Sequence, residues 1–209
     1  MNGGRPRAVL FDLLTALIDS WSLWDNVAGN RDDGRRWRAA YLKDTYGAGS
    51  YRPYEAMVRN AAVAVGLPAV LADRLAARYG ELQPWPEVGA VLGPLQGQVK
   101  LAIVTNCSEQ LGRIAAARTG IAFDCIVTAE RAGCYKPHPA PYRLALAELG
   151  AVPAESLFVA GSAYDLGGAA SVGLPVFWHD RVGMALPLGA PPPRWHHASL
   201  HALTQIVLG

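Results

Sequence analysis

Short apolar runs alternate with helical patterns along most of this chain, and this alternation limits the available folds more than any other feature. Each run is three or four residues long and ends in polar or glycine-rich residues, as strands buried on both faces do. A strand followed by a helix, repeated, predicts a doubly wound α/β core with a parallel, Rossmann-like sheet. The runs cover residues 8–11, 101–104, 125–127, 157–160 and 175–178, and the helical patterns between them cover 109–118, 139–149 and 166–172.

The stretch between the first run and about residue 82 departs from that alternation. No strand-like run occurs in it, and its apolar residues recur at helical spacing in three sets. Two closely spaced prolines, Pro84 and Pro86, then end the helical pattern, because proline resists continuing a helix. We therefore predict an all-helical cap over residues 18–83, inserted after the first strand, and an α/β core made of residues 1–17 and 84–209.

Composition and charge argue against several classes of partner. With 51% hydrophobic residues among 209, the chain can bury a sizeable core. Its formal charge of +2 comes from largely dispersed charged residues, which does not favour a nucleic-acid partner. No run approaches the roughly 18 apolar residues that span a bilayer, so no membrane partner is expected. Three cysteines, an odd number without a C-x-x-C pair, favour a reducing, cytoplasmic location.

Polar residues follow the predicted strands and should meet at one edge of the sheet. In an open parallel sheet the ligand site lies at the carboxyl ends of the strands, where Asp12, Thr105, Asn106, Lys136 and Asp165 would converge. A carboxylate such as Asp12 can act as a nucleophile if a cation such as Lys136 keeps it ionised. Thr105 and Asn106 can bind an anionic part of a substrate or a departing anion. Asp165 can hold either a water molecule or the lysine.

Four segments resemble, in order and spacing, the four motifs of the haloacid dehalogenase superfamily. They are residues 11–19, 104–106, 135–139 and 159–165. With the predicted cap between the first two motifs, the resemblance covers nearly the whole chain. It implies a hydrolase in which Asp12 attacks the substrate and water then splits the resulting ester.

Within that superfamily the chain is most similar to the L-2-haloacid dehalogenases. Phosphatases of the superfamily resemble D-x-D at the first motif, and Leu14 replaces the second aspartate here. The dehalogenases resemble S-x-N-A-[WF]-D at the fourth motif, which residues 163–165 match in part. They also carry a Trp-Arg pair in the cap and a tyrosine six residues after the lysine, matched by Trp37 with Arg38 and by Tyr142.

The resemblance implies a role for each candidate residue. The catalytic residues are Asp12, Lys136 and Asp165, and Arg38 and Asn106 would hold the leaving group or the substrate carboxylate. The other predicted substrate-binding residues are Thr105, Tyr142, Ser162 and Tyr164. The substrate would be a small-molecule carboxylate, with no cofactor and no metal ligand, and the family analogy suggests a homodimer through the cap. Because Arg38 lies among other arginines, a solvated basic face is the alternative for that residue.

Several positions depart from the dehalogenase pattern and leave alternatives open. Thr15 and Ala16 stand where the family has Gly-Thr, and Ala160 and Ser162 stand where its fourth motif has Ser and Asn. The same nucleophile could open the strained ring of a small cyclic amino acid, as azetidine-2-carboxylate hydrolases of this group do. A phosphatase that requires Mg²⁺ and a non-catalytic binding protein are the remaining alternatives.

Overall fold

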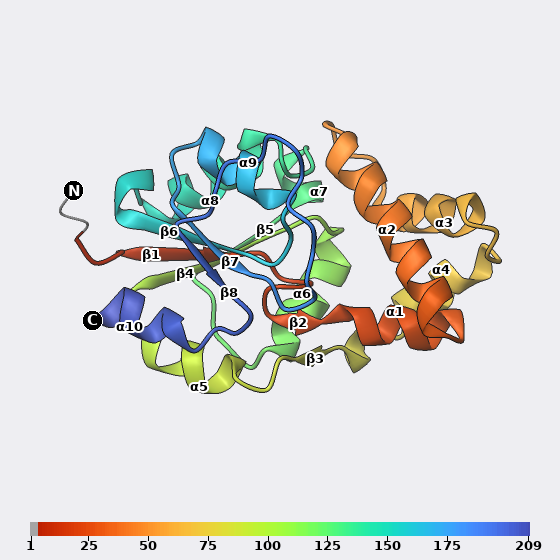
Figure 1. The fold of residues 1–209 in the computed structure, drawn as a ribbon, viewed down its shortest axis with the longest axis horizontal. Coiled ribbons are helices and arrows are strands. Elements are labelled where there is room, and N and C mark those ends of the chain that lie inside the picture. Colours follow the sequence, from red (N-terminus) through yellow and green to blue (C-terminus); the bar gives the residue numbers. More distant parts are fainter. Residues whose placement is uncertain (1–3) are drawn as a thin grey trace.

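The structure, a computed structural model, describes residues 4–209, so residues 1–3 of the predicted core lie outside the described residues. Its main feature is a six-stranded parallel sheet (Figure 1) with the strand order β5-β4-β1-β6-β7-β8. The predicted doubly wound α/β fold is therefore confirmed. The strands are β1 (Ala8–Phe11), β4 (Lys100–Thr105), β5 (Cys125–Thr128), β6 (Ser156–Ala160), β7 (Val176–His179) and β8 (Trp195–His197).

Helices cover both faces of this sheet. Alternate residues of β1 point to opposite faces. Val9 and Phe11 join the core formed with α5, α6 and α10, whereas Ala8 and Leu10 join the core formed with α8 and α9. The helices of this part are α5 (Val88–Leu92), α6 (Glu109–Arg118), α7 (Ala129–Ala132), α8 (Pro139–Leu149), α9 (Asp165–Ser171) and α10 (Ala202–Leu208), with short 3-10 turns η2 (Gly93–Leu95) and η3 (Pro153–Glu155).

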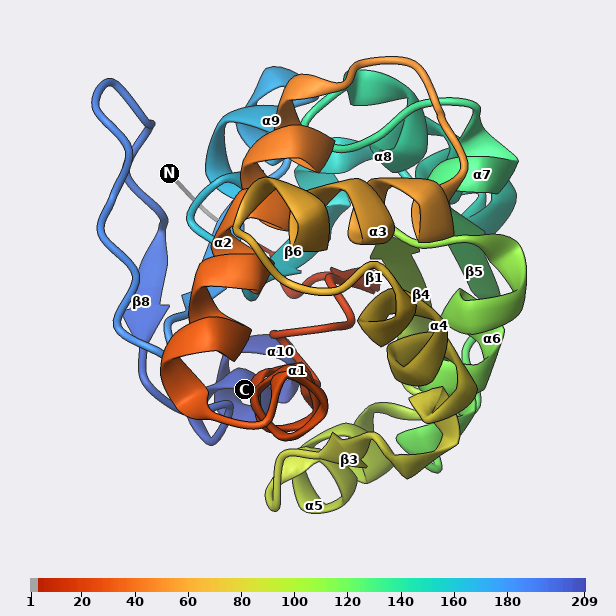
Figure 2. The same cartoon turned by 90° about the vertical axis from the view of Figure 1, so that its right-hand side faces the viewer.

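Between β1 and β4 the chain forms a separate helical lobe, which we define as residues 20–81. It faces the viewer in Figure 2, in front of the carboxyl ends of the sheet strands. Its helices pack through aromatic rings: Trp24 lies 4.6 Å from Trp37 and 5.2 Å from Tyr41 between ring centroids. The elements of the lobe are α1 (Ser20–Ala28), α2 (Arg31–Gly47), α3 (Tyr54–Ala64), α4 (Val70–Ala77) and the 3-10 turn η1 (Tyr79–Glu81).

The 17-residue helix α2 is the element of the lobe that matters most for the site. The side chain of Asn30 caps it by accepting a hydrogen bond from the backbone N–H of Asp33 at 2.9 Å. Asp32 and Asp33 lie in its first turn, where negative side chains interact favourably with the helix dipole. Because α2 runs for more than four turns, residues eight apart along it share a face.

The two connections between the lobe and the sheet lie side by side. Strand β2 (Ile18–Asp19) leads into the lobe and pairs antiparallel with β3 (Gln83–Pro84), which leads out of it. Trp85 fastens this pair to the loop after β1, because its backbone N–H donates to Leu17 O at 2.9 Å and its indole Nε1 donates to Thr15 O at 2.8 Å. In the described part of the chain, no helix is long and apolar enough to cross a membrane.

Candidate active site

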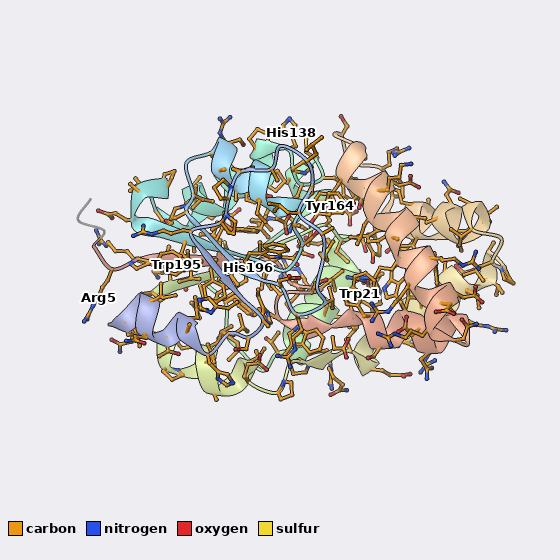
Figure 3. All side chains as sticks on the ribbon, in the orientation of Figure 1. Arg5, Trp21, His138, Tyr164, Trp195 and His196 are labelled. Carbon is orange, nitrogen blue, oxygen red and sulfur yellow. The ribbon has the colours of Figure 1, made fainter. Side chains whose placement is uncertain are left out.

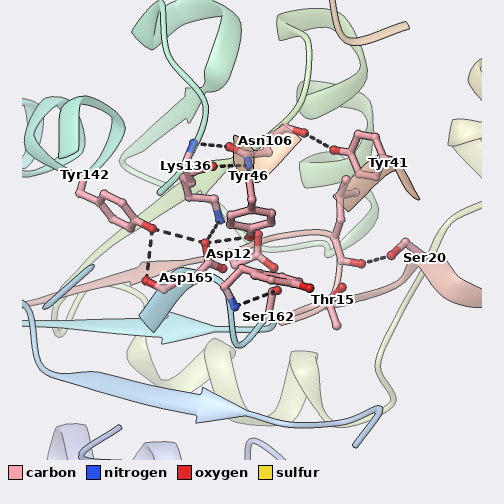
Figure 4. Close-up of polar contacts among 12 residues, drawn as sticks. Asp12, Thr15, Ser20, Tyr41, Tyr46, Asn106, Lys136, Tyr142, Ser162 and Asp165 are labelled. Carbon is pink, nitrogen blue, oxygen red and sulfur yellow. Dashed lines mark hydrogen bonds and ion pairs between the residues drawn. The ribbon is translucent and has the colours of Figure 1, made fainter. Parts of the chain in front are cut away.

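Three charged side chains meet at the carboxyl end of the sheet (Figure 4). Asp12 directly follows β1, and its backbone N–H donates to Val159 O at 2.9 Å. Nζ of the fully buried Lys136 lies 2.8 Å from Oδ1 of Asp12 and 3.1 Å from Oδ1 of Asp165, the first residue of α9. The structure therefore brings the three predicted catalytic residues into direct contact.

Burial and charge set the protonation of this cluster. Burial alone would lower the pKa of Lys136, but the carboxylates of Asp12 and Asp165 outweigh it and raise that pKa above its usual value. Burial raises the pKa of Asp165 to about 6, although Lys136 acts in the opposite direction. The lysine is therefore a cation, and Asp165 is ionised above about pH 6.

The amide of Asn106 fixes the segment that carries Lys136. Its Nδ2 donates to Lys136 O at 3.0 Å, and its Oδ1 accepts from the backbone N–H of Lys136 at 2.7 Å. Tyr41, from α2, donates to Asn106 O at 2.8 Å. Because an amide nitrogen carries two hydrogens, one N–H of Asn106 remains for a bound anion. Asn106 was predicted to bind an anion. Its hydrogen bonds to the backbone of Lys136 are an additional, structural role that was not predicted.

A small pocket opens onto Asp12 between the sheet and the lobe. Its volume is about 20 Å³, room for roughly one water molecule. Predicted site residues from both parts of the chain share this pocket with residues that were not predicted. It is lined by Asp12, Leu14, Thr15, Arg38, Tyr41, Leu42, Tyr46, Thr105, Asn106 and Ser162.

Arg38 is the most unusual charge in this pocket, because it is buried without an acidic partner among residues 4–209. Its exposed fraction is 1%, so the alternative of a solvated basic face is wrong for this residue. Nη2 donates to Thr15 Oγ1 at 3.0 Å and to Leu14 O at 3.3 Å, whereas Nε and Nη1 have no partner among residues 4–209. The guanidinium lies over the Trp21 ring, 4.6 Å from its centroid. Nε and Nη1 of this buried cation are therefore free to bind an anion at the pocket that Arg38 lines.

The remaining predicted residues divide into two groups. Thr105 and Ser162 line the pocket, and the buried hydroxyl of Thr105 has no partner within the described residues. Tyr142 and Tyr164 are not among the residues that line it. Tyr142 lies against Phe158 and donates to Oδ1 of Asp165 at 3.3 Å. Tyr164 is 42% exposed at the border between sheet and lobe (Figure 3), since it precedes α9 and turns outward.

Gly161 explains how the loop after β1 approaches the end of β6. A Cβ at this position would collide with the backbone of Thr15 and Ala16. Only glycine therefore allows the loop that begins with Asp12 to lie against the segment that leads to Asp165.

Comparison with known proteins accounts for this arrangement. A family model described as haloacid dehalogenase-like hydrolase matches residues 7–173, a range that contains every site residue named above. The chain belongs to this family. It is 30% identical to the haloacetate dehalogenase H-2 of Moraxella sp. (strain B), over 90% of this chain and 92% of that protein. It is also 30% identical to an (S)-2-haloacid dehalogenase of Xanthobacter autotrophicus, over 81% of this chain and 73% of that one.

The structural comparison identifies the same branch of the family. An L-2-haloacid dehalogenase from Xanthobacter autotrophicus with chloropropionic acid covalently bound superposes with a TM-score of 0.87, over 98% of this chain and 99% of that chain, at 25% identity. The chain is thus a haloacid dehalogenase-like hydrolase of the L-2-haloacid dehalogenase-like branch, and membership in this enzyme family sets aside the non-catalytic alternative.

The donor set of this haloacid dehalogenase-like hydrolase does not suit a magnesium ion. Mg²⁺ requires close to octahedral oxygen coordination, and Leu14 offers no side-chain ligand where phosphatases of the superfamily have a second aspartate. Asp12 and Asp165 both contact Nζ of Lys136 instead. No group of three or more His, Cys, Asp or Glu side chains that could hold a metal ion occurs in the described part of the chain.

Tyr46, a residue of α2 that was not predicted, also reaches this hydrolase's site. Its hydroxyl donates to Oδ1 of Asp165 at 2.9 Å, and its ring lies 5.2 Å from that of Tyr164. Arg38, Leu42 and Tyr46 follow one another at intervals of four residues and all line the pocket. That spacing, counted from Arg38 along the predicted helix, is the signal that could have identified Tyr46.

Proposed function

We propose that this hydrolase cleaves the carbon–halogen bond of a small 2-haloacid, with Asp12 as nucleophile and a covalent ester as intermediate. One observation carries the proposal. A carboxylate held by a buried lysine shares a small pocket with a buried guanidinium that has no acidic partner in the described part of the chain. The first group is suited to attack a carbon atom, and the second to bind an anion. The names of its relatives, haloacetate and 2-haloacid dehalogenases, support the same reaction.

In the first step Asp12 attacks C2 of the substrate. A bond forms between a carboxylate oxygen and C2, and the carbon–halogen bond breaks so that halide leaves with its electron pair. Lys136 holds Oδ1 of Asp12, which leaves Oδ2 as the attacking oxygen. The free donors of Arg38, with the hydroxyl of Thr105, bind the substrate carboxylate or the departing halide.

In the second step water attacks the carbonyl carbon of the Asp12 ester. Asp165 takes the proton from the water, and Lys136 stabilises the negative charge that develops on Oδ1 of Asp12. Collapse of this intermediate breaks the bond between the carbonyl carbon and the ester oxygen, which takes the proton held by Asp165 and leaves as the 2-hydroxy acid. Asp12 keeps the water oxygen and returns to a carboxylate as the second water proton is released. Asp165 does not line the pocket, but its buried Oδ2 has no partner among the described residues and can accept a hydrogen bond from a water molecule that reaches it.

We infer that the helical lobe acts as a cap during this cycle. The pocket holds about one water molecule when the lobe lies as it does in the structure, so a haloacid enters only if the lobe or its side chains move. With the lobe in place, bulk water is excluded and the charges of Asp12 and Arg38 act at full strength. No step of this scheme requires a metal ion or another cofactor.

Halide release from L-2-chloropropionate in the presence of a metal chelator tests the proposal. The intact protein is compared with Asp12→Asn and with Asp44→Asn, the same change at an exposed position of α2. We expect release from the intact protein and from Asp44→Asn, and none from Asp12→Asn. The proposal fails if the intact protein releases no halide from 2-haloacids. Azetidine-2-carboxylate, and phosphate esters with Mg²⁺, would then test ring opening and phosphoryl transfer.

A further inference from the structure

The carboxylate of Asp165 is held unevenly by its surroundings. Three donors converge on Oδ1: Nζ of Lys136 at 3.1 Å, the hydroxyl of Tyr46 at 2.9 Å and the hydroxyl of Tyr142 at 3.3 Å. Oδ2 is buried and receives no hydrogen bond within residues 4–209. The donors therefore fix the rotation of the carboxylate and leave one oxygen free.

The shortest of these contacts is the only one that comes from the helical lobe. Lys136 and Tyr142 belong to the sheet domain, whereas Tyr46 lies near the carboxyl end of α2. Its ring also packs against Tyr164, the residue that precedes Asp165, at 5.2 Å between centroids. The lobe thus reaches across the pocket and holds both Asp165 and its neighbour.

The fourth motif itself supplies little to hold Asp165. Ala160 has no side-chain donor, and the hydroxyl of Ser162 accepts a hydrogen bond from the backbone N–H of Tyr164 at 3.3 Å. Both positions are among those at which the chain departs from the dehalogenase pattern. The carboxylate of Asp165 instead receives a hydrogen bond from the hydroxyl of Tyr46, which belongs to α2 and not to the segment before Asp165.

We propose that Tyr46 is a positioning residue for ester hydrolysis: its hydroxyl fixes Oδ1 of Asp165 so that Oδ2 accepts the attacking water. Because Tyr46 belongs to the lobe, this arrangement is complete only while the lobe lies against the sheet domain. Water activation is thereby coupled to closure of the site around the bound ester. The proposal rests on the function proposed above.

The electrostatics of the cluster support this role. The groups that face Asp165 are Lys136, Asp12, Tyr46 and Tyr142, from the sheet domain and the lobe together. Burial raises the pKa of Asp165 to about 6, and the hydrogen bond from Tyr46 acts in the opposite direction because it favours the ionised form. Burial and the nearby carboxylates raise the pKa of Tyr46 well above its usual value, so this hydroxyl keeps its proton and remains a donor.

The test compares Tyr46→Phe with Tyr51→Phe. Tyr51 is a matched control, since its ring also stacks on another tyrosine, Tyr135 at 5.5 Å, while its hydroxyl accepts only a long 3.4 Å bond from a backbone N–H. With L-2-chloropropionate, Tyr46→Phe should lower kcat on the order of tenfold, since the lost hydrogen bond is to a charged group. KM should fall with kcat and leave kcat/KM unchanged, because only the step after ester formation is slowed. The acid limb of kcat against pH should move upward, and quenched samples should show the Asp12 ester accumulating. Tyr51→Phe should change none of these.

The outcomes separate this inference from the function on which it rests. The role of Tyr46 is overturned if the intact protein releases halide and Tyr46→Phe has the same kcat, the same acid limb and the same level of ester. That result would leave the proposed dehalogenase function standing. Equal losses in Tyr46→Phe and Tyr51→Phe would also overturn the role of Tyr46, because they would indicate general damage to the fold. No halide release from the intact protein would refute the dehalogenase function, and the positioning role with it.

Discussion

Replacing Lys136 by methionine should destabilise the protein in a way that depends on pH. The ammonium group is fully buried between Oδ1 of Asp12 at 2.8 Å and Oδ1 of Asp165 at 3.1 Å. Methionine is close to lysine in size, so the change removes the charge with little loss of packing. Two carboxylates then remain close together in a buried site without their cation.

The size of the effect follows from the charges left behind. Removing one partner of a buried ion pair costs about 3–5 kcal/mol. We expect the free energy of unfolding to fall by an amount in this range at pH 8. The pKa of Asp165, already raised to about 6 by burial, rises further without the lysine. A carboxyl whose pKa is higher in the folded than in the unfolded state makes stability fall as pH rises through that interval. At pH 5 a carboxyl of the variant takes up a proton. The decrease in the free energy of unfolding should then be roughly 1–2 kcal/mol smaller than at pH 8, which corresponds to a shift of about one pKa unit.

Urea unfolding at pH 5 and pH 8 measures both values. The control is Lys43→Met, the same substitution at an exposed position of α2, which should stay within about 0.5 kcal/mol of the intact protein at either pH. A decrease of less than about 1 kcal/mol in the free energy of unfolding at pH 8, or equal decreases for the Lys136 variant at both pH values, would refute the stabilising role of this cation.

Two further predictions concern residues on either side of the pocket. Arg38→Met should abolish detectable halide release, because it removes the buried cation proposed to bind the substrate carboxylate or the halide. Arg36→Met, at an exposed position of the same helix, should retain halide release. Unchanged turnover in the Arg38 variant would rule out the anion-binding role. Asn106→Ala should lower the free energy of unfolding by about 1–3 kcal/mol, since it removes both hydrogen bonds to the buried backbone of Lys136, and urea unfolding that finds no loss would contradict that structural task.

Most of the sheet domain could be predicted because its elements carry strong local signals. The helical patterns over 109–118 and 139–149 have the same bounds as α6 and α8, and each of the five apolar runs contains or overlaps a strand. Strand β8 was not predicted, and the reason is physical. It lies at the edge of the sheet, its residues are partly or fully exposed, and His196 and His197 give it no apolar run.

Site residues that follow strands of the sheet could be predicted from the fold, whereas Arg38 of the lobe was predicted only through the family resemblance. Parallel strands carry Asp12 and Asp165 to a common edge, so their approach to Lys136 follows from the topology. The position of Tyr46 depends instead on how the helical lobe packs against that edge, which local sequence does not specify. Tyr142 and Tyr164 illustrate the same limit, since the family pattern locates each residue in the chain but not the direction of its ring.

The antiparallel pairing of β2 with β3 has a consequence for how such a protein can diversify. The chain leaves and re-enters the sheet domain at adjacent points, Ile18 opposite Pro84 and Asp19 opposite Gln83. An insertion of any length that begins and ends on this two-stranded ribbon leaves the path of β1, and so the place of Asp12, unchanged. Selection can therefore exchange the helical lobe, and with it Arg38 and Tyr46, while it keeps Asp12 and Lys136 of the sheet domain in place.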